Sequence, residues 1–249
     1  MKRKPLLAMG VLFAGAACVL AQEGVRQQPP LYRGPATDVQ GVFVTPVAGI
    51  PFSATVLIES ARTLPDGTTE TRHTQVLIAR DSRGRIRNER HAMVAESFKG
   101  MPPLLSVHIF DPQTRVSSFY TPYTRLVRQL TLPPRPNGEP GNPAGKDLGN
   151  TTLNGFDARG TEVDREIPAQ MSGSGKAVHV VDEFWYSEDL HMNLLERHTD
   201  VRNGVQTVAI LAIERNEPPE KLFELPEGYK VVDMTPPPPE GGNTPLATR

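Results

Sequence analysis

Apolar and polar residues alternate along short stretches of the chain with the two-residue period that is typical of β-strands. Together with an enrichment in β-branched and aromatic residues, this alternation predicts strands at 52–63, 73–80, 85–91, 104–110, 116–120, 125–130, 152–156, 158–167, 177–186, 191–201 and 205–213. Turn residues separate the stretches, for example Pro65-Asp66-Gly67 and Asn203-Gly204. Asn-Gly between two strand patterns is a strong hairpin signal and favours a type I′ turn.

These strands recur with short connections, so consecutive strands are expected to pair as antiparallel neighbours. The segment 208–213 is apolar at both odd and even positions, which is typical of a strand buried on both faces. We therefore expect a cover over this strand, formed by a short helical turn at 218–223 or by loops of the first half. No segment has the pattern of a long amphipathic helix, and 92–99 allows two turns at most. The pattern predicts a mostly β protein with a single antiparallel meander sheet and little helix.

Proline- and glycine-rich stretches interrupt this pattern at three places. We interpret 22–40 as a flexible N-terminal segment, 132–149 as a Pro-rich insert and 235–249 as a disordered Pro-rich tail. The insert offers a boundary between two domains near residue 140. Each half has few strands, however, and a small sheet alone buries little surface. We therefore predict a single β domain over 41–234.

The N-terminus has the features of an export signal. Basic residues at 2–4 precede an apolar run at 6–20 that is too short to span a bilayer comfortably. We place cleavage after Ala21, so that residues 1–21 form the signal peptide. Lipidation at Cys18 is the alternative, and it fits less well because a glycine stands three residues before it. The protein is therefore predicted to be periplasmic or secreted.

Composition and charge exclude several classes of protein. Hydrophobic residues make up 38% of the chain, which is too apolar for a wholly disordered protein. A net charge of −1 excludes a strong generic nucleic-acid binder. The single cysteine excludes a disulfide scaffold and a thiolate zinc cluster.

The sequence contains no recognisable catalytic motif. None of the six histidines stands in an HExxH motif. The stretch 172–175 (SGSG) fails as a nucleophile elbow because its glycines are wrongly spaced. The carboxylates at 182, 183, 188 and 189 alternate between strand faces, so we interpret them as surface charge. We predict a protein that is not an enzyme and that has no cofactor and no metal site.

Three consecutive aromatic residues, Phe184, Trp185 and Tyr186, end one predicted strand. Alternation places Trp185 on one face of the strand and the other two on the opposite face. One face must meet the core, and the other is available to line a groove for an apolar ligand. Ordinary packing of both faces is the alternative. These three residues are our candidate binding residues.

From Leu148 onward the chain resembles a group of uncharacterised secreted bacterial proteins. The positions that carry this resemblance are Leu148-Gly149, Asn154-Gly155, Gly160-Thr161, Ile167-Pro168, Glu183-x-Trp185-Tyr186-Ser187-x-Asp189-Leu190, Asp200-x-Arg202-x-Gly204, Arg215-x-Glu217-Pro218 and Leu222-Phe223-x-x-Pro226-x-Gly228-Tyr229. Ile109-x-Asp111-Pro112 fits the same group. The resemblance implies a secreted protein and implies no particular activity.

The second half is also similar to the periplasmic lipoprotein-carrier family and its sensor relatives. In both, a strand that ends in an aromatic residue is followed by a turn, a hairpin and a final LFxxPxGY segment, here at 222–229. The similarity implies a half-barrel, a curved antiparallel sheet whose concave face holds acyl chains or a partner. The chain departs from that family because it lacks long covering helices.

These observations lead to three hypotheses about function. The first is an exported, non-enzymatic cell-envelope protein that binds an apolar or lipid-like ligand on a curved sheet. The second is a protein-interaction or scaffold module of the envelope, with the Pro-rich termini as tethers. The third is a hydrolase whose site is assembled from distant residues. The expected partners are therefore a lipid or an envelope protein, and not a nucleic acid.

Overall fold

The computed structural model describes residues 44–134 and 144–237, and nearly every element within them is a strand. The predicted signal peptide, the N-terminal segment 22–40, the middle of the insert and most of the tail lie outside the described residues. One four-residue 3-10 helix, η1 (Glu220–Phe223), is the only helix in the described part. No helix there is long and apolar enough to cross a membrane.

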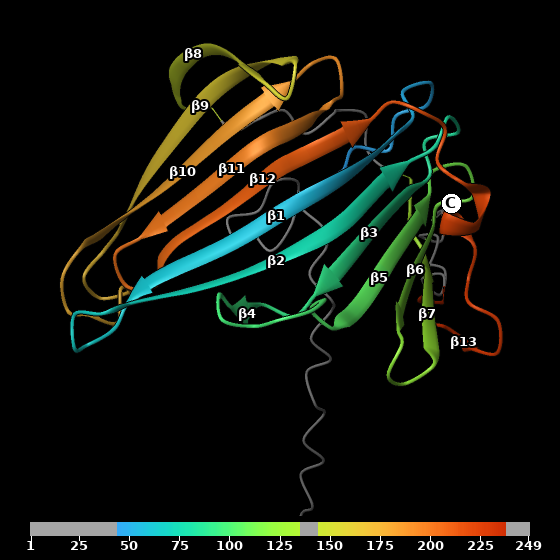
Figure 1. Ribbon diagram of the computed structural model, residues 1–249, viewed down its shortest axis with the longest axis horizontal. Helices are drawn as coiled ribbons and strands as arrows, with labels where there is room; N and C mark the ends of the chain where they lie inside the picture. The colour runs from blue at the N-terminus through green and yellow to red at the C-terminus, as the bar shows by residue number, and fades with distance from the viewer. Residues whose placement is uncertain (1–43, 135–143, 238–249) are drawn as a thin grey trace, which may run out of the picture. The chain divides into compact units, whose positions relative to one another are not determined.

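The strands form one open, curved sheet that consists of two antiparallel meanders (Figure 1). The first meander contains β1 (Phe52–Thr63), β2 (Thr69–Arg80), β3 (Ile86–His91), β5 (Leu104–Asp111), β6 (Val116–Thr121) and β7 (Leu126–Thr131). The second contains β8 (Lys146–Leu153), β9 (Phe156–Ile167), β10 (Val178–Ser187), β11 (Met192–Asp200) and β12 (Gly204–Glu214). The antiparallel pairing of β1 with β12 joins the two meanders. The predicted fold class is therefore confirmed.

Two short strands complete the sheet. The two-residue strand β4 (Val94–Ala95) pairs with the beginning of β2, where the sequence allowed a short helix. Strand β13 (Lys230–Asp233) pairs with β7 and is parallel to it, so the sheet is not a pure meander. The sequence analysis missed β13. It also ended the Pro-rich insert at residue 149, whereas β8 already begins at Lys146.

The main hydrophobic core gathers residues from both meanders, which ties the two halves of the sheet together. Its buried members are Val44, Phe52, Ala54, Val56, Ile58, Val76, Ile78, Ile86, Ala158, Leu190, Met192, Leu194, Val208 and Ile210. A smaller second core consists of Val107, Ile109, Tyr120 and Val127, with Leu104, Leu225 and Tyr229 packed against it.

The two cores lie on opposite faces of the sheet. Within β5, Val107 and Ile109 belong to the second core, whereas the next residue, Phe110, packs against the main core. Successive side chains of a strand point to opposite faces, so this change of core marks a change of face. The C-terminal segment covers the second core with Leu225 and with Tyr229, whose ring meets Tyr120 edge-on at 5.7 Å.

Strand β12 is not buried on both faces, in contrast to the prediction for 208–213. Val208 and Ile210 are buried, but Leu211 is 44% exposed. The register with β1 slips at this point, and Leu211 is the extra residue of a β-bulge. The bulge shifts the alternation by one residue and returns Ile213 to the main core. Apolar residues at both even and odd positions, Val208, Ile210 and Ile213, therefore face the main core.

Of the two covers expected for β12, the short helical turn at 218–223 does not form one, because η1 packs beside β3. The Leu222 carbonyl accepts a hydrogen bond from Arg87 Nη1 at 2.9 Å. The guanidinium of Arg85 lies over the Phe223 ring at 4.8 Å.

The Asn203-Gly204 turn is not of type I′, because only Gly204 has a positive φ, +93°. The backbone N–H of Asn203 donates to the backbone carbonyl of Asp200 at 3.0 Å, and Asp200 pairs with Gly204 in the β11–β12 ladder. A type I turn followed by a glycine bulge has this arrangement. The two-residue turn with positive φ at both positions is Asn154-Gly155, between β8 and β9.

Candidate functional site

The three predicted aromatic residues lie at the end of β10 and divide between the two faces, as alternation predicts. Phe184 is buried, while Trp185 and Tyr186 are half-buried. The Trp185 ring packs closely over Gly160 of β9, where an added side chain would collide with it. The Trp185 Nε1–H donates to Glu183 Oε1 at 2.5 Å. A role of these residues in binding stays a prediction.

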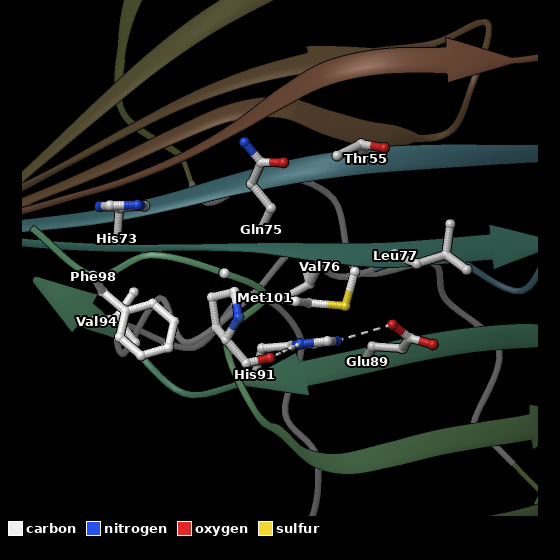
Figure 2. A pocket seen from close by; sticks show the side chains of 12 residues that line it. Thr55, His73, Gln75, Val76, Leu77, Glu89, His91, Val94, Phe98 and Met101 are labelled. Carbon is white, nitrogen blue, oxygen red and sulfur yellow. Dashed lines mark hydrogen bonds and ion pairs between the residues drawn. The ribbon is translucent and has the colours of Figure 1, made fainter. Parts of the chain in front are cut away.

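A cavity of about 540 Å³ lies elsewhere, beside β2 (Figure 2). That volume falls within the range of small-molecule sites, roughly 300–1,000 Å³. Its lining residues come from β1, β2, β3, β4 and the segment that leads to β5: Thr55, His73, Gln75, Val76, Leu77, Glu89, His91, Val94, Phe98, Gly100, Met101 and Pro102. None of the predicted aromatic residues lines it.

The cavity lies where β2 loses its neighbour. Strand β3 pairs with β2 only at Ile78–Arg80, and β4 pairs with it only at Arg72 and His73. Between these points, 74–77 has no partner on that side among the described strands. The facing chain from Asn88 to Val94 is one residue longer than the stretch of β2 that it follows. The pairing with β2 is interrupted over this stretch, which we call the wide bulge, and the space opens there.

One wall of the cavity is polar and carries a chain of hydrogen bonds. Glu89 Oε1 accepts from Arg87 Nη2 at 2.8 Å, and Glu89 Oε2 lies 3.1 Å from His91 Nε2. His91 Nδ1 lies 2.9 Å from the Pro102 carbonyl oxygen, which ties the segment before β5 to β3 (Figure 2). Arg87 Nη1 continues the chain to Tyr120 Oη at 3.2 Å, in the second core. The charge of Glu89 is thus neutralised within the wall.

The rest of the lining is mainly apolar. Leu77 of β2 and Val94 of β4 contribute to it, as do Phe98, Met101 and Pro102 of the segment before β5 (Figure 2). Phe98 is 43% exposed. The side chains of His73 and Gln75, on β2, lie beside this apolar surface and form no hydrogen bond with another described side chain.

The lining contains few groups of the kinds that act as nucleophiles or metal ligands. Glu89 is its only carboxylate, and both of its oxygens are engaged. No serine, cysteine or lysine lines the cavity. Nor does the described part of the chain contain a group of three or more His, Cys, Asp or Glu side chains that could hold a metal ion.

A histidine–serine pair on β5 and β6 lies apart from the cavity. His108 Nε2 is 2.8 Å from Ser117 Oγ, but the Phe119 ring stacks on the imidazole at 4.1 Å. Ser117 is buried, and burial lowers the pKa of His108 to about 4. A nucleophile must be accessible to its substrate, so this pair has the character of a packed structural contact.

The sequence analysis missed the cavity because it searched the strands. The segment 92–103 reads AMVAESFKGMPP, and at most two helical turns were expected in its first part, 92–99. One feature of the sequence could have indicated the cavity. Phe98 and Met101 are large apolar residues in a stretch that lacks the alternation of a strand. Large apolar residues in an irregular segment either pack or remain exposed.

Comparisons with known proteins give no family. No family model and no curated protein matches the chain. Among solved structures, an uncharacterized conserved protein from Thermus thermophilus is similar with a TM-score of 0.42 and 15% identity, over 74% of this chain and 91% of that chain. A chain of the Pseudomonas aeruginosa MucA/MucB complex is similar with a TM-score of 0.38 and 14% identity, over 73% of this chain and 58% of that chain. A LolA superfamily protein from Nitrosomonas europaea has 0.31 and 14%, over 72% and 91%. At these scores and identities the similarities carry no argument about function.

Proposed function

We propose that the protein is an exported, non-enzymatic binding module of the cell envelope that holds an apolar or lipid-like ligand in the cavity beside β2. The observation that carries this proposal is the lining itself. It combines an apolar surface, which includes Leu77, Val94 and Phe98, with a polar wall whose charge is already neutralised. Transfer of apolar groups from water to such a surface is favourable, and no unpaired ion in the wall opposes it.

The lining places polar groups between two apolar parts. Val94 lies opposite His73, and Leu77 follows Gln75 on β2 (Figure 2). A ligand whose apolar groups contact Leu77 and Val94 meets His73 and Gln75 with a polar group between them. Specific small-molecule sites combine an apolar surface with a few convergent polar groups in this way.

The test is ligand binding with a matched pair of variants. Native mass spectrometry of the protein purified from membranes should show a bound lipid, and a fluorescent fatty acid should bind in titration. Leu77→Gln should weaken this binding by about tenfold, since it removes one apolar contact and places an amide there. Leu211→Gln is the control, because Leu211 is an exposed strand leucine outside the cavity. A clean apo mass without uptake of fatty acid contradicts the proposal, as does equal weakening by both variants.

The protein-interaction module remains the second candidate from the sequence. The Pro-rich tethers that suggested it lie largely outside the described residues, so they add no structural support.

A further inference from the structure

The large hydrophobic side chains that are most exposed all lie at one end of the sheet. In the described part of the chain these are Tyr123 (98% exposed), Met101 (84%), Met171 (76%) and Val201 (76%). The next is Met234, at 55%. Scattered apolar residues on a surface are ordinary, but apolar tips gathered at one rim mark an interaction site.

The strand register places these residues together. In an antiparallel sheet, alternate connections lie at the same end, and the pairing of β1 with β12 extends this rule across both meanders. The connections β1–β2, β3–β5, β6–β7, β9–β10 and β11–β12 therefore form one rim, along the lower side of Figure 1. We call it the loop rim and define it as 64–68, 92–103, 122–125, 168–177 and 201–203.

The opposite rim has none of these apolar tips. Its connections are 81–85, 112–115, 154–155 and 188–191, and no exposed large hydrophobic residue lies in them. Its leucine, Leu190, is buried in the main core. The asymmetry is therefore a property of one end of the sheet and not of loops in general.

Cations outnumber carboxylates at the loop rim. It contains Lys99, Arg125, Lys176 and Arg202, against Asp66 and Glu96, and Glu227 lies in the segment that leads into β13 beside Arg125. Arg202 is engaged by Asp200 at 2.6 Å. The side chains of Lys99, Arg125 and Lys176 form no ion pair with any described residue. The opposite rim carries equal numbers of cations and carboxylates, and the whole chain has a net charge of −1.

Cations and apolar tips alternate along the rim. Lys99 lies two residues from Met101, and Arg125 lies two residues from Tyr123. A polypeptide surface that combines exposed apolar side chains with basic residues binds the interface of an anionic bilayer, where apolar groups enter the acyl boundary and cations meet phosphates.

We propose that the loop rim docks on an anionic phospholipid surface. The inference does not depend on a ligand in the cavity, although Phe98 and Met101 belong to both, so that docking brings the cavity mouth to the bilayer. This arrangement favours a membrane over a protein partner. The cations and apolar side chains are spread over several loops, as suits an extended anionic surface, and they do not converge on one pocket that would hold a side chain of a partner protein.

The experiment measures co-flotation of the full chain with vesicles. Vesicles of phosphatidylglycerol and phosphatidylcholine are compared with vesicles of phosphatidylcholine alone. Every protein carries Cys18→Ser, which prevents acylation, and all share the same N-terminus, so that the N-terminus contributes equally. The rim variants avoid the cavity: Tyr123→Ser with Met171→Ser removes two apolar tips, and Arg125→Gln with Lys176→Gln removes two cations.

We expect the wild type to float with the anionic vesicles and not with the neutral ones. The cation variant should bind about 25-fold more weakly, since each basic residue near an anionic surface contributes about fivefold. The apolar variant should lose about tenfold. The control, Leu211→Ser, removes an exposed apolar residue at the β1–β12 bulge, away from the loop rim, and should bind as the wild type does.

Two outcomes overturn the proposal. One is a wild type that binds neither kind of vesicle, which leaves the rim to a protein partner. The other is a wild type whose binding survives unchanged in both rim variants. Fatty-acid binding by the rim variants separates this proposal from the cavity ligand, because neither variant alters a lining residue.

Discussion

Arg80 is the largest fully buried side chain of the described residues, and its guanidinium is held by carbonyl oxygens and not by a carboxylate. Nε donates to the Ile50 carbonyl at 2.9 Å, Nη1 to that of Thr45 at 2.7 Å and Nη2 to that of Leu190 at 2.9 Å. The guanidinium also lies over the Phe52 ring at 4.8 Å. Burial lowers its pKa to about 10, so the group is still charged at neutral pH.

These contacts indicate that Arg80 fastens two segments to the sheet. One is the approach to β1, with Thr45 and Ile50, and the other is the β10–β11 turn, with Leu190. Arg80→Ala leaves three carbonyls without this donor, at about 1 kcal/mol each or more, and removes the packing on Phe52. Relief from burying a charge offsets part of this loss. We expect the free energy of unfolding to fall by about 3–5 kcal/mol.

The assay is chemical denaturation, with Arg83→Ala as the control. Arg83 is the next arginine along the chain, its side chain is 48% exposed, and it pairs with Glu220 on the surface. Its loss should cost at most about 1 kcal/mol. Arg80→Lys should give an intermediate loss, because an ammonium cannot reach three carbonyls as a planar fork does. Similar denaturation midpoints for Arg80→Ala and Arg83→Ala would refute the reasoning.

Two further predictions concern β10 and β11. Burial raises the pKa of Glu196 from 4.5 to about 7. Between these two pH values the folded protein holds a proton that the unfolded chain has lost, so the free energy of unfolding falls as the pH rises. Glutamine does not titrate, so Glu196→Gln should gain about 3 kcal/mol relative to the wild type across this window. Denaturant titrations at several pH values measure this difference. Trp185 is the only tryptophan. Its fluorescence should not respond to a fatty acid in the cavity, and Trp185→Ala should cost about 2–3 kcal/mol in thermal melts. A stability difference between Glu196→Gln and the wild type that does not change with pH would contradict the first expectation. A shift of the Trp185 emission when the fatty acid is added would contradict the second.

Local sequence patterns predict the strands but not which strands pair across the middle of the sheet. The bounds 52–63 of β1 match the prediction because alternation and the flanking turn residues are local signals. The pairing of β1 with β12 depends on residues about 150 positions apart, such as Leu57 and Ala209. Nothing in either segment alone specifies that register.

Bulges explain most of the remaining errors. The bulge at Leu211 makes a strand with one buried face look apolar on both, because the alternation changes phase within it. The wide bulge between β3 and β4 cannot be inferred from Glu89 to Met93 alone, since its length is defined only against β2. The cavity, which depends on that bulge, was therefore out of reach of the sequence, whereas the division of Phe184 and Trp185 between faces was not.

The same bulge links the two proposed surfaces. By opening the space beside 74–77 it creates the cavity, and the segment 92–103 that closes this space also places Phe98 and Met101 on the loop rim. One local departure from regular pairing thus supplies both the apolar lining and part of the exposed rim. The two roles separate at other residues, because Leu77 lies in the cavity and away from the rim, while Tyr123 lies on the rim and away from the cavity. Substitutions at these two residues therefore test the cavity and the loop rim separately, although the bulge contributes to both.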